Sequence, residues 1–175
     1  TIKDSDSDKN RSSSELIETA ATGIVEMPDY SSIISSAKKM TYREFDQTYL
    51  SGQKEMSGVI EISDRRNVEL RGTIKGKGVI YSSGNMDLKH LQSYPGSSIL
   101  FYSDGNVVSQ KLDFYGTIYA PNGSVEFNGD PNNSGYGKIL ARDRLEFNGA
   151  KFSLEAYPAA DDWMTTLTGG SRLIE

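Results

Sequence analysis

The chain has 175 residues, a net charge of −5 and an apolar share of 36%. This length suits a single domain with tails, and the low apolar share excludes a large conventional core. No apolar run approaches the roughly 20 residues of a membrane-spanning helix, and the acidic balance disfavours nucleic-acid binding. With no cysteine and one histidine, disulfides, thiolate metal sites and multi-histidine zinc sites are excluded.

The chain begins with a polar stretch of mixed charge. Residues 1–27 contain too few apolar side chains to offset the entropy lost on ordering. They are therefore predicted to form a largely disordered linker.

Helical signals follow between residues 28 and 57. Asp29 is placed to cap a short helix running to Met40. Thr41 and Glu44 have the spacing of a capping box, which predicts the start of a second short helix. The aromatic residues on one face of that helix would be Tyr42, Phe45 and Tyr49. We therefore expect residues 28–57 to form a helical lead-in that covers the first end of a β-structure.

A repeat appears from residue 58 onward. Glycines recur at intervals of about 20 residues; they are Gly58, Gly78, Gly96, Gly116 and Gly137. Each copy contains a short strand, a turn rich in Gly, Asn, Asp or Ser, and an apolar–acid–apolar strand. This period, without a helical pattern inside it, predicts one coil of a parallel β-solenoid. The sequence thus predicts a mostly β fold, a single-stranded β-helix of about five coils over residues 58–156. The alternative is an antiparallel β-sandwich.

Strand alternation predicts which side chains point inward. One inward column would contain Val68, Met86, Val107, Val125 and Leu145, and a second Leu70, Leu88, Ser109, Phe127 and Phe147. A strand-end column would contain Tyr81, Tyr102, Tyr119 and Leu140. The open ends of a solenoid invite aggregation unless they are covered. We expect residues 157–175 to form a C-terminal cap, with Trp163 as a cap contact, followed by a flexible tail.

The repeat phrases resemble a known family. Gly116-Thr-Ile-Tyr-Ala-Pro-Asn-Gly123, Val125-Glu-Phe-Asn-Gly129 and Leu145-Glu-Phe-Asn-Gly149 are similar to the β-helical ectodomain of type IV pilus-assembly proteins. More distantly they resemble the β-solenoids of bactofilins. The first resemblance implies a pilin-like membrane helix upstream of this chain, a location at the bacterial cell surface, and pilus or other surface proteins as partners. It brings no catalytic residues.

Four outward acids are candidate cation ligands because neighbouring coils lie about 4.8 Å apart and close carboxylates can recruit a cation such as Ca²⁺. They are Glu69, Asp87, Glu126 and Glu146. A solvated face, neutralised by nearby Arg and Lys, is the alternative. Converging carboxylates in a groove, as a polysaccharide-cleaving β-helix would need, are not indicated. We therefore expect no enzyme activity, catalytic residue or cofactor.

The function with most support at this level is a structural or adhesive surface module associated with pili. One alternative is a bactofilin-like cytoskeletal polymer. The other is a carbohydrate-binding β-helix, in which exposed rings of Tyr81, Tyr102 and Tyr119 would stack on sugars. The same three tyrosines could equally be a packing column at the strand ends.

Overall fold

The computed structural model describes residues 27–129, 133–149 and 152–167. The linker expected over residues 1–27 therefore lies outside the described residues except for Met27, and so does the tail after residue 167. The fold is mostly β, with 51% strand and 13% helix, wound as a parallel β-solenoid of about six turns. This confirms the predicted fold class.

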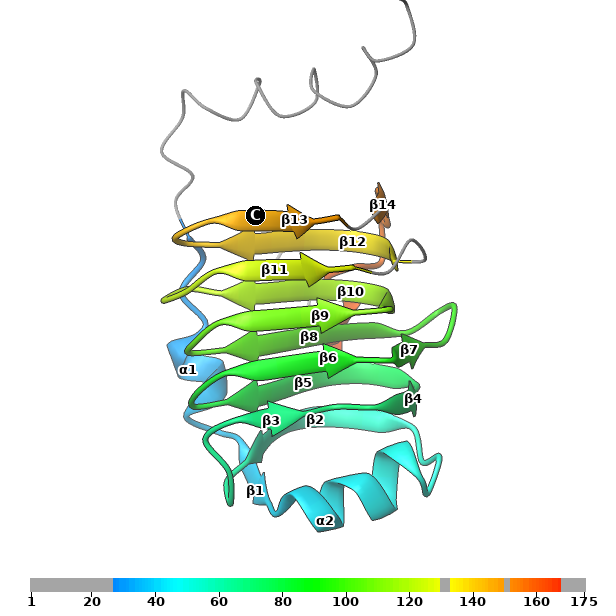
Figure 1. Ribbon diagram of the computed structural model, residues 1–175. Coiled ribbons are helices and arrows are strands. Elements are labelled where there is room, and N and C mark those ends of the chain that lie inside the picture. The colour runs from blue at the N-terminus through cyan, green and yellow to red at the C-terminus, as the bar shows by residue number, and fades with distance from the viewer. Residues whose placement is uncertain (1–26, 130–132, 150–151, 168–175) are drawn as a thin grey trace, which may run out of the picture.

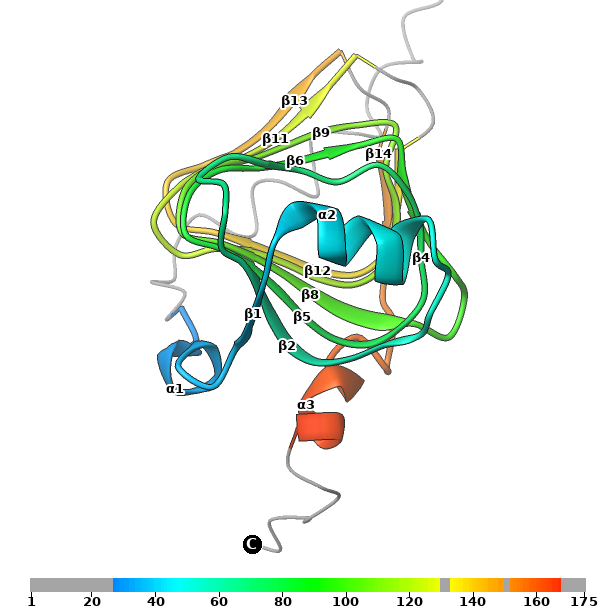
Figure 2. The same cartoon turned by 90° about the horizontal axis from the view of Figure 1, so that it is seen from below.

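The described strands form two parallel sheets around a three-sided coil (Figures 1 and 2). The larger sheet contains β1 (Lys38–Met40), β2 (Met56–Ile62), β4 (Gly72–Ile74), β5 (Gly76–Ser82), β7 (Leu91–Ser93), β8 (Ser98–Ser103), β10 (Asp113–Ala120), β12 (Asn133–Ala141) and β14 (Phe152–Glu155). The smaller sheet contains β3 (Val68–Glu69), β6 (Met86–Lys89), β9 (Val107–Gln110), β11 (Val125–Asn128) and β13 (Leu145–Asn148). The smaller sheet faces β2, β5, β8 and β12 of the larger sheet, whose strands β4 and β14 lie on the third side. Successive coils begin at β2, β5, β8, β10 and β12, while β1 and β14 extend the larger sheet at either end.

The register of these strands follows the sequence repeat. Val68 pairs with Met86, and the same column continues upward through the later coils. The tyrosine column also forms, because Tyr81 pairs with Tyr102, Tyr102 with Tyr119, and Tyr119 with Leu140. Equivalent residues of successive coils therefore lie directly above one another, as the repeat predicts.

One glycine does not fit the predicted column. Gly78 and Gly116 both pair with Ile99 rather than with Gly96. Gly96 instead lies three residues earlier, after Pro95, at a positive φ of 87° in the turn before β8. The third coil therefore has a longer corner, and Gly96 lies in the turn at that corner rather than in the column of stacked strand residues.

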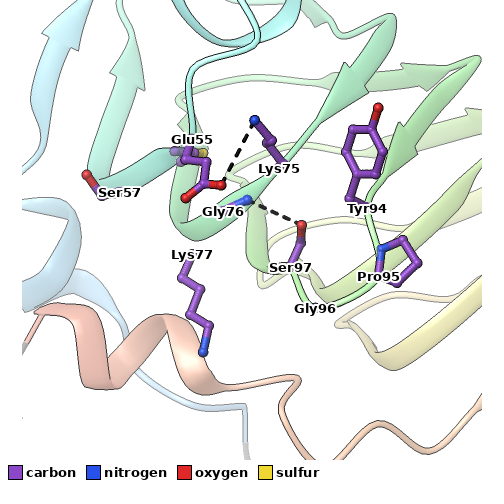
Figure 3. Close-up of a pocket in the computed structure, with 10 residues that line it drawn as sticks. Glu55, Ser57, Lys75, Gly76, Lys77, Tyr94, Pro95, Gly96 and Ser97 are labelled. Carbon is purple, nitrogen blue, oxygen red and sulfur yellow. Dashed lines mark hydrogen bonds and ion pairs between the residues drawn. The ribbon is translucent and has the colours of Figure 1, made fainter.

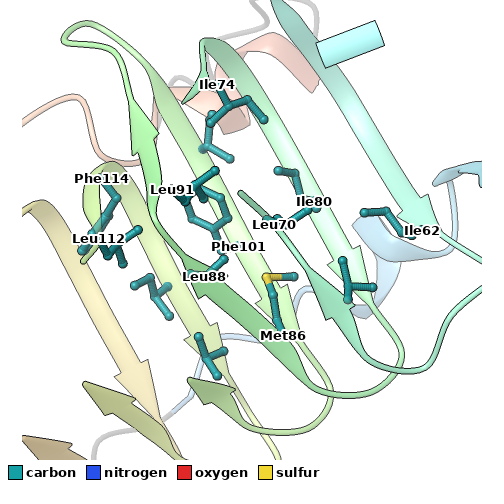
Figure 4. Packing of buried hydrophobic residues seen from close by; sticks show 14 of the residues in the cluster. Ile62, Leu70, Ile74, Ile80, Met86, Leu88, Leu91, Phe101, Leu112 and Phe114 are labelled. Carbon is teal, nitrogen blue, oxygen red and sulfur yellow. The ribbon is translucent and has the colours of Figure 1, made fainter. Parts of the chain in front are cut away.

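The interior between the sheets is apolar and closely packed (Figure 4). Ile80, Leu88 and Phe101 are fully buried there, each from a different strand. Ser109 is also buried in the second column, and its hydroxyl donates to the carbonyl of Leu88 at 3.5 Å. The thin coil needs only these few large side chains per turn, which accounts for the low apolar share of the chain.

The first part of the lead-in differs from the prediction. The expected helix from Asp29 to Met40 is wrong, because α1 covers only Ser31–Ile34 and β1 then adds a strand beside β2. The Asp29 carboxylate still accepts a hydrogen bond from the amide of Ser31 at 2.9 Å. Pairing of Lys38–Met40 with the first coil satisfies main-chain groups that a longer helix would have left on the coil edge.

The second part of the lead-in covers the first end of the coil, as expected (Figure 2). Thr41 and Glu44 form the predicted capping box at the start of α2 (Tyr42–Phe45), which continues as a π-helical turn, η2 (Asp46–Leu50). Phe45 and Tyr49 are 0% and 8% exposed, and both belong to the core cluster of the coil. The helix therefore closes this end by inserting its aromatic face.

The described part of the C-terminal segment, residues 157–167, does not cover the last end, so the predicted cap is wrong for these residues. Helix α3 (Asp162–Leu167) folds back along the outside of the coil and packs against β2, β5 and β8 (Figure 2). Trp163 is fully buried there, and its amide donates to the hydroxyl of Ser98 at 3.0 Å. The helix packs on this outer face because Val59, Val79 and Leu100 form an apolar patch there that Trp163 covers. None of the described helices is long and apolar enough to span a membrane.

Within the described residues, the last coil therefore ends in what we call the open end, formed by β13 and β14 (Figure 1). Among the described strands, β13 pairs only with β11 and β14 only with β12. Leu145, Phe147 and Leu154 are 44%, 40% and 47% exposed at this end, whereas Val125 and Phe127 one coil earlier are fully buried.

Because the coils stack closely, we expect two glycines with positive φ to differ in how much stability is lost when each is replaced by alanine. A Cβ added to Gly137, at φ 148°, would collide with the carbonyl of Gly116 in the neighbouring strand, whereas one added to Gly58, at φ 80°, would meet nothing within 4 Å. We expect Gly58→Ala to cost only about 1–2 kcal/mol of backbone strain. Gly137→Ala should cost about 2 kcal/mol more, because the β10–β12 ladder must separate. Urea unfolding of both variants measures this, and equal costs would contradict the stacking.

Candidate functional site

A hollow of about 420 Å³ lies at the corner where the first coils begin (Figure 3). Its walls come from the segment leading into β2, the start of β5 and the turn before β8. The residues that define it chemically are Glu55, Lys75, Lys77, Tyr94 and Ser97. We refer to it below as the corner hollow.

Main-chain geometry fixes the floor of the corner hollow. The amide of Gly76 donates to the hydroxyl of Ser97 at 3.3 Å, which ties the turn of one coil to the strand of the coil before (Figure 3). A side chain on Gly76, at φ 112°, would strike the backbone of Met56. The glycine thus allows the close approach of strands that shapes this corner.

The charged groups around the corner hollow face each other. Lys75 Nζ lies 4.0 Å from a Glu55 carboxylate oxygen, and Lys77 Nζ lies 2.8 Å from a carboxylate oxygen of Asp162 in α3. Tyr94 is 49% exposed and presents an open aromatic ring. This arrangement suits a neutral, polar ligand with a flat apolar face better than a free anion, because each ammonium already has a carboxylate partner.

Sequence reasoning missed this hollow. The glycine period assigns Gly96 to the strand repeat, and the pairing of Lys77 with Asp162 joins positions far apart in the chain. The Pro95-Gly96 dipeptide was the available signal, since such pairs mark turns.

The four outward acids lie on one face, as the strand alternation predicts. Glu69 pairs with Asp87 and Glu126 with Glu146 in the strand register, while Val108 interrupts the column between them. Each carboxylate has a partner. Three form ion pairs: Glu69 with Arg71, Asp87 with Lys89 at 3.5 Å, and Glu146 with Arg144 at 2.9 Å. The fourth, Glu126, accepts a hydrogen bond from the side-chain amide of Asn148 at 2.7 Å.

The described residues contain no group of three or more His, Cys, Asp or Glu side chains arranged to hold a metal ion. Calcium takes about six to eight oxygen ligands, and the acid column offers its carboxylates in register pairs. One oxygen, Asp87 Oδ1, is buried without a hydrogen-bond partner among the described residues. Binding of Ca²⁺ by the column stays a prediction.

The tyrosine column is largely covered. Tyr102 and Tyr119 are 8% and 2% exposed, and α1 with α3 packs over them. Tyr30 of the lead-in lies edge-on to both Tyr119 and Trp163, with ring centroids 4.9 and 5.3 Å apart. We call these rings, together with Tyr81, the aromatic seam. In this arrangement Tyr102 and Tyr119 have no open face on which a sugar could stack.

The hydroxyl groups of the aromatic seam are anchored as well. Tyr81 donates to the carboxylate of Asp104 and Tyr119 to the carbonyl of Pro28. Burial, together with the nearby charge of Asp104, raises the pKa of Tyr102 to about 12 and that of Tyr81 still further. The seam therefore joins the lead-in, the coil and the C-terminal helix through protonated phenols.

Comparisons with protein-family models, with curated proteins and with solved structures found no significant match to this chain.

The raised pKa of Tyr102 predicts a loss of stability in alkali. An unfolded tyrosine ionises near pH 10, so the stabilisation is complete below that pH and is lost as the pH rises from about 10 through about 12. Tyr102→Phe keeps the ring but cannot ionise, so its free energy of unfolding should fall less steeply over this window. Denaturant titrations at several pH values measure the two slopes, and identical slopes would contradict the assignment.

Proposed function

We propose that this chain is a non-catalytic structural or adhesive module of a bacterial surface protein associated with type IV pili. The proposal rests chiefly on one observation, the resemblance of the repeat phrases over residues 116–129 and 145–149 to pilus-assembly ectodomains. These phrases lie on β10 in the larger sheet and on β11 and β13 in the smaller sheet, and the last two stack directly on one another. The residues that support the resemblance are thus those that build the coil itself.

The architecture supports a mechanical role. Each inner coil is hydrogen-bonded through its main chain to the coils above and below it, and the aromatic seam holds both ends of the described chain on the same face. Such a rod resists bending and presents long, flat sheet faces that suit contacts with other proteins. The surface carboxylates already engaged by Arg, Lys or Asn side chains suit a solvated face better than acid–base chemistry.

The role in pili is tested in the bacterium that encodes the chain. We expect the gene to encode an apolar segment of about 20 residues upstream of Thr1. Deletion of the gene should reduce the number of surface pili seen by electron microscopy, and the full gene should restore them. An unchanged number of pili in the deletion strain, together with no apolar segment upstream, would overturn the proposal.

A further inference from the structure

We propose that the open end of the solenoid is a dimerisation surface that binds the same end of a second copy of this chain, related by a two-fold axis. This inference is independent of the proposed role in pili. It follows from the strand edges, the exposed side chains and the charges at that end.

The open end combines unpaired main chain with apolar side chains. The outer edges of β13 and β14 have no partner among the described strands, and such edges readily add another strand. Phe147 is 40% exposed although it belongs to a cluster with Phe127 and Phe152, with ring centroids 4.4 to 5.6 Å apart. The side chains of this patch are therefore of the same apolar kind as those buried inside the earlier coils, but here they are partly exposed.

The chain itself shows how side chains of this kind pack against each other. One coil below, the edge of β11 has the sequence Val125-Glu-Phe-Asn128, and β13 covers it with the nearly identical Leu145-Glu-Phe-Asn148. The two phenylalanine rings stack at 5.3 Å with an interplanar angle of 9°, and Asn148 donates to the side-chain oxygen of Asn128 at 3.1 Å. The Glu-Phe-Asn side chains of one strand thus pack on those of another strand, and β13 presents the same side chains at its outer edge. Within the chain the two strands run parallel, whereas under a two-fold axis β13 of each copy would run antiparallel to β13 of the other.

The other end of the coil determines how many copies can join. Helix α2 and η2 occupy it with Phe45 and Tyr49 buried, so it cannot receive the open end of another molecule. The described part of each copy therefore has one uncovered coil end that can pair with another copy. Two such ends form an isologous contact that closes on itself, whereas a head-to-tail contact would grow into a filament.

The charge at the open end permits this contact. The chain has a net charge of −5, but the exposed turn before β13 and the strand itself carry two positive and two negative groups. They are Arg142, Asp143, Arg144 and Glu146. With Glu155 of β14 added, the described open end has one more negative than positive group. Under a two-fold axis such a mixed edge can place opposite charges together, so two copies repel each other less here than two uniformly acidic surfaces would.

Sedimentation velocity of the purified chain over a range of concentrations tests the proposal. We expect a reversible monomer–dimer equilibrium without larger species. Phe147→Glu and, separately, Leu154→Glu should each weaken dimerisation by about tenfold or more, because each buries a carboxylate at the contact. Tyr94→Glu is the matched control, an equally exposed aromatic at the corner hollow, and should leave the dimer unchanged.

Circular dichroism and thermal unfolding of each variant verify that the coil is intact, as expected for side chains already exposed. Small-angle X-ray scattering should give a dimer longer than the monomer along the coil axis rather than broader. A chain that stays monomeric, a dimer that both open-end variants leave intact, or a series of growing oligomers would each overturn the proposal.

Discussion

The structure depends on one constraint, the in-register parallel stacking of successive coils. Each coil satisfies its main-chain donors and acceptors only through its neighbours, so the coils stand or fall together. Stacking also places side chains of the same kind above one another, with apolar Val68 and Met86 in one column and Tyr81 and Tyr102 in another. The side-chain columns, the thin core and the close glycine contacts between strands all follow from this single arrangement.

A stack of this kind has two ends, and this chain treats them differently. The lead-in helix closes the first end with Phe45, whereas the C-terminal helix leaves the last end and covers the aromatic seam instead. Packing at the seam stabilises the fold because Tyr30, Tyr119 and Trp163 bury large rings against a sheet that would otherwise be exposed. The described coil therefore has one end closed by the lead-in helix and one end at which apolar side chains of β13 and β14 are partly exposed.

Local, repetitive features were predictable from the sequence, while long-range packing was not. The columns through Val68 and Tyr81 follow from strand alternation and a near-constant period. The shifted Gly96 shows that one longer corner is enough to mislead a repeat argument. The position of Trp163 depends on contacts with residues more than 60 positions away, which no local pattern encodes. For the same reason the strand alternation predicts the tyrosine column but not its burial under α1 and α3.

Disulfide trapping in this cysteine-free chain tests the parallel register most directly. Asp87 lies opposite Val108, and Lys89 opposite Gln110, in the middle of the coil. Parallel stacking brings such partners within about 5 Å, which suits a disulfide. The paired variants Asp87→Cys with Val108→Cys and Lys89→Cys with Gln110→Cys should therefore both oxidise within one molecule. Efficient cross-linking of the crossed combinations instead, position 87 with 110 and 89 with 108, would show antiparallel strands and contradict the account.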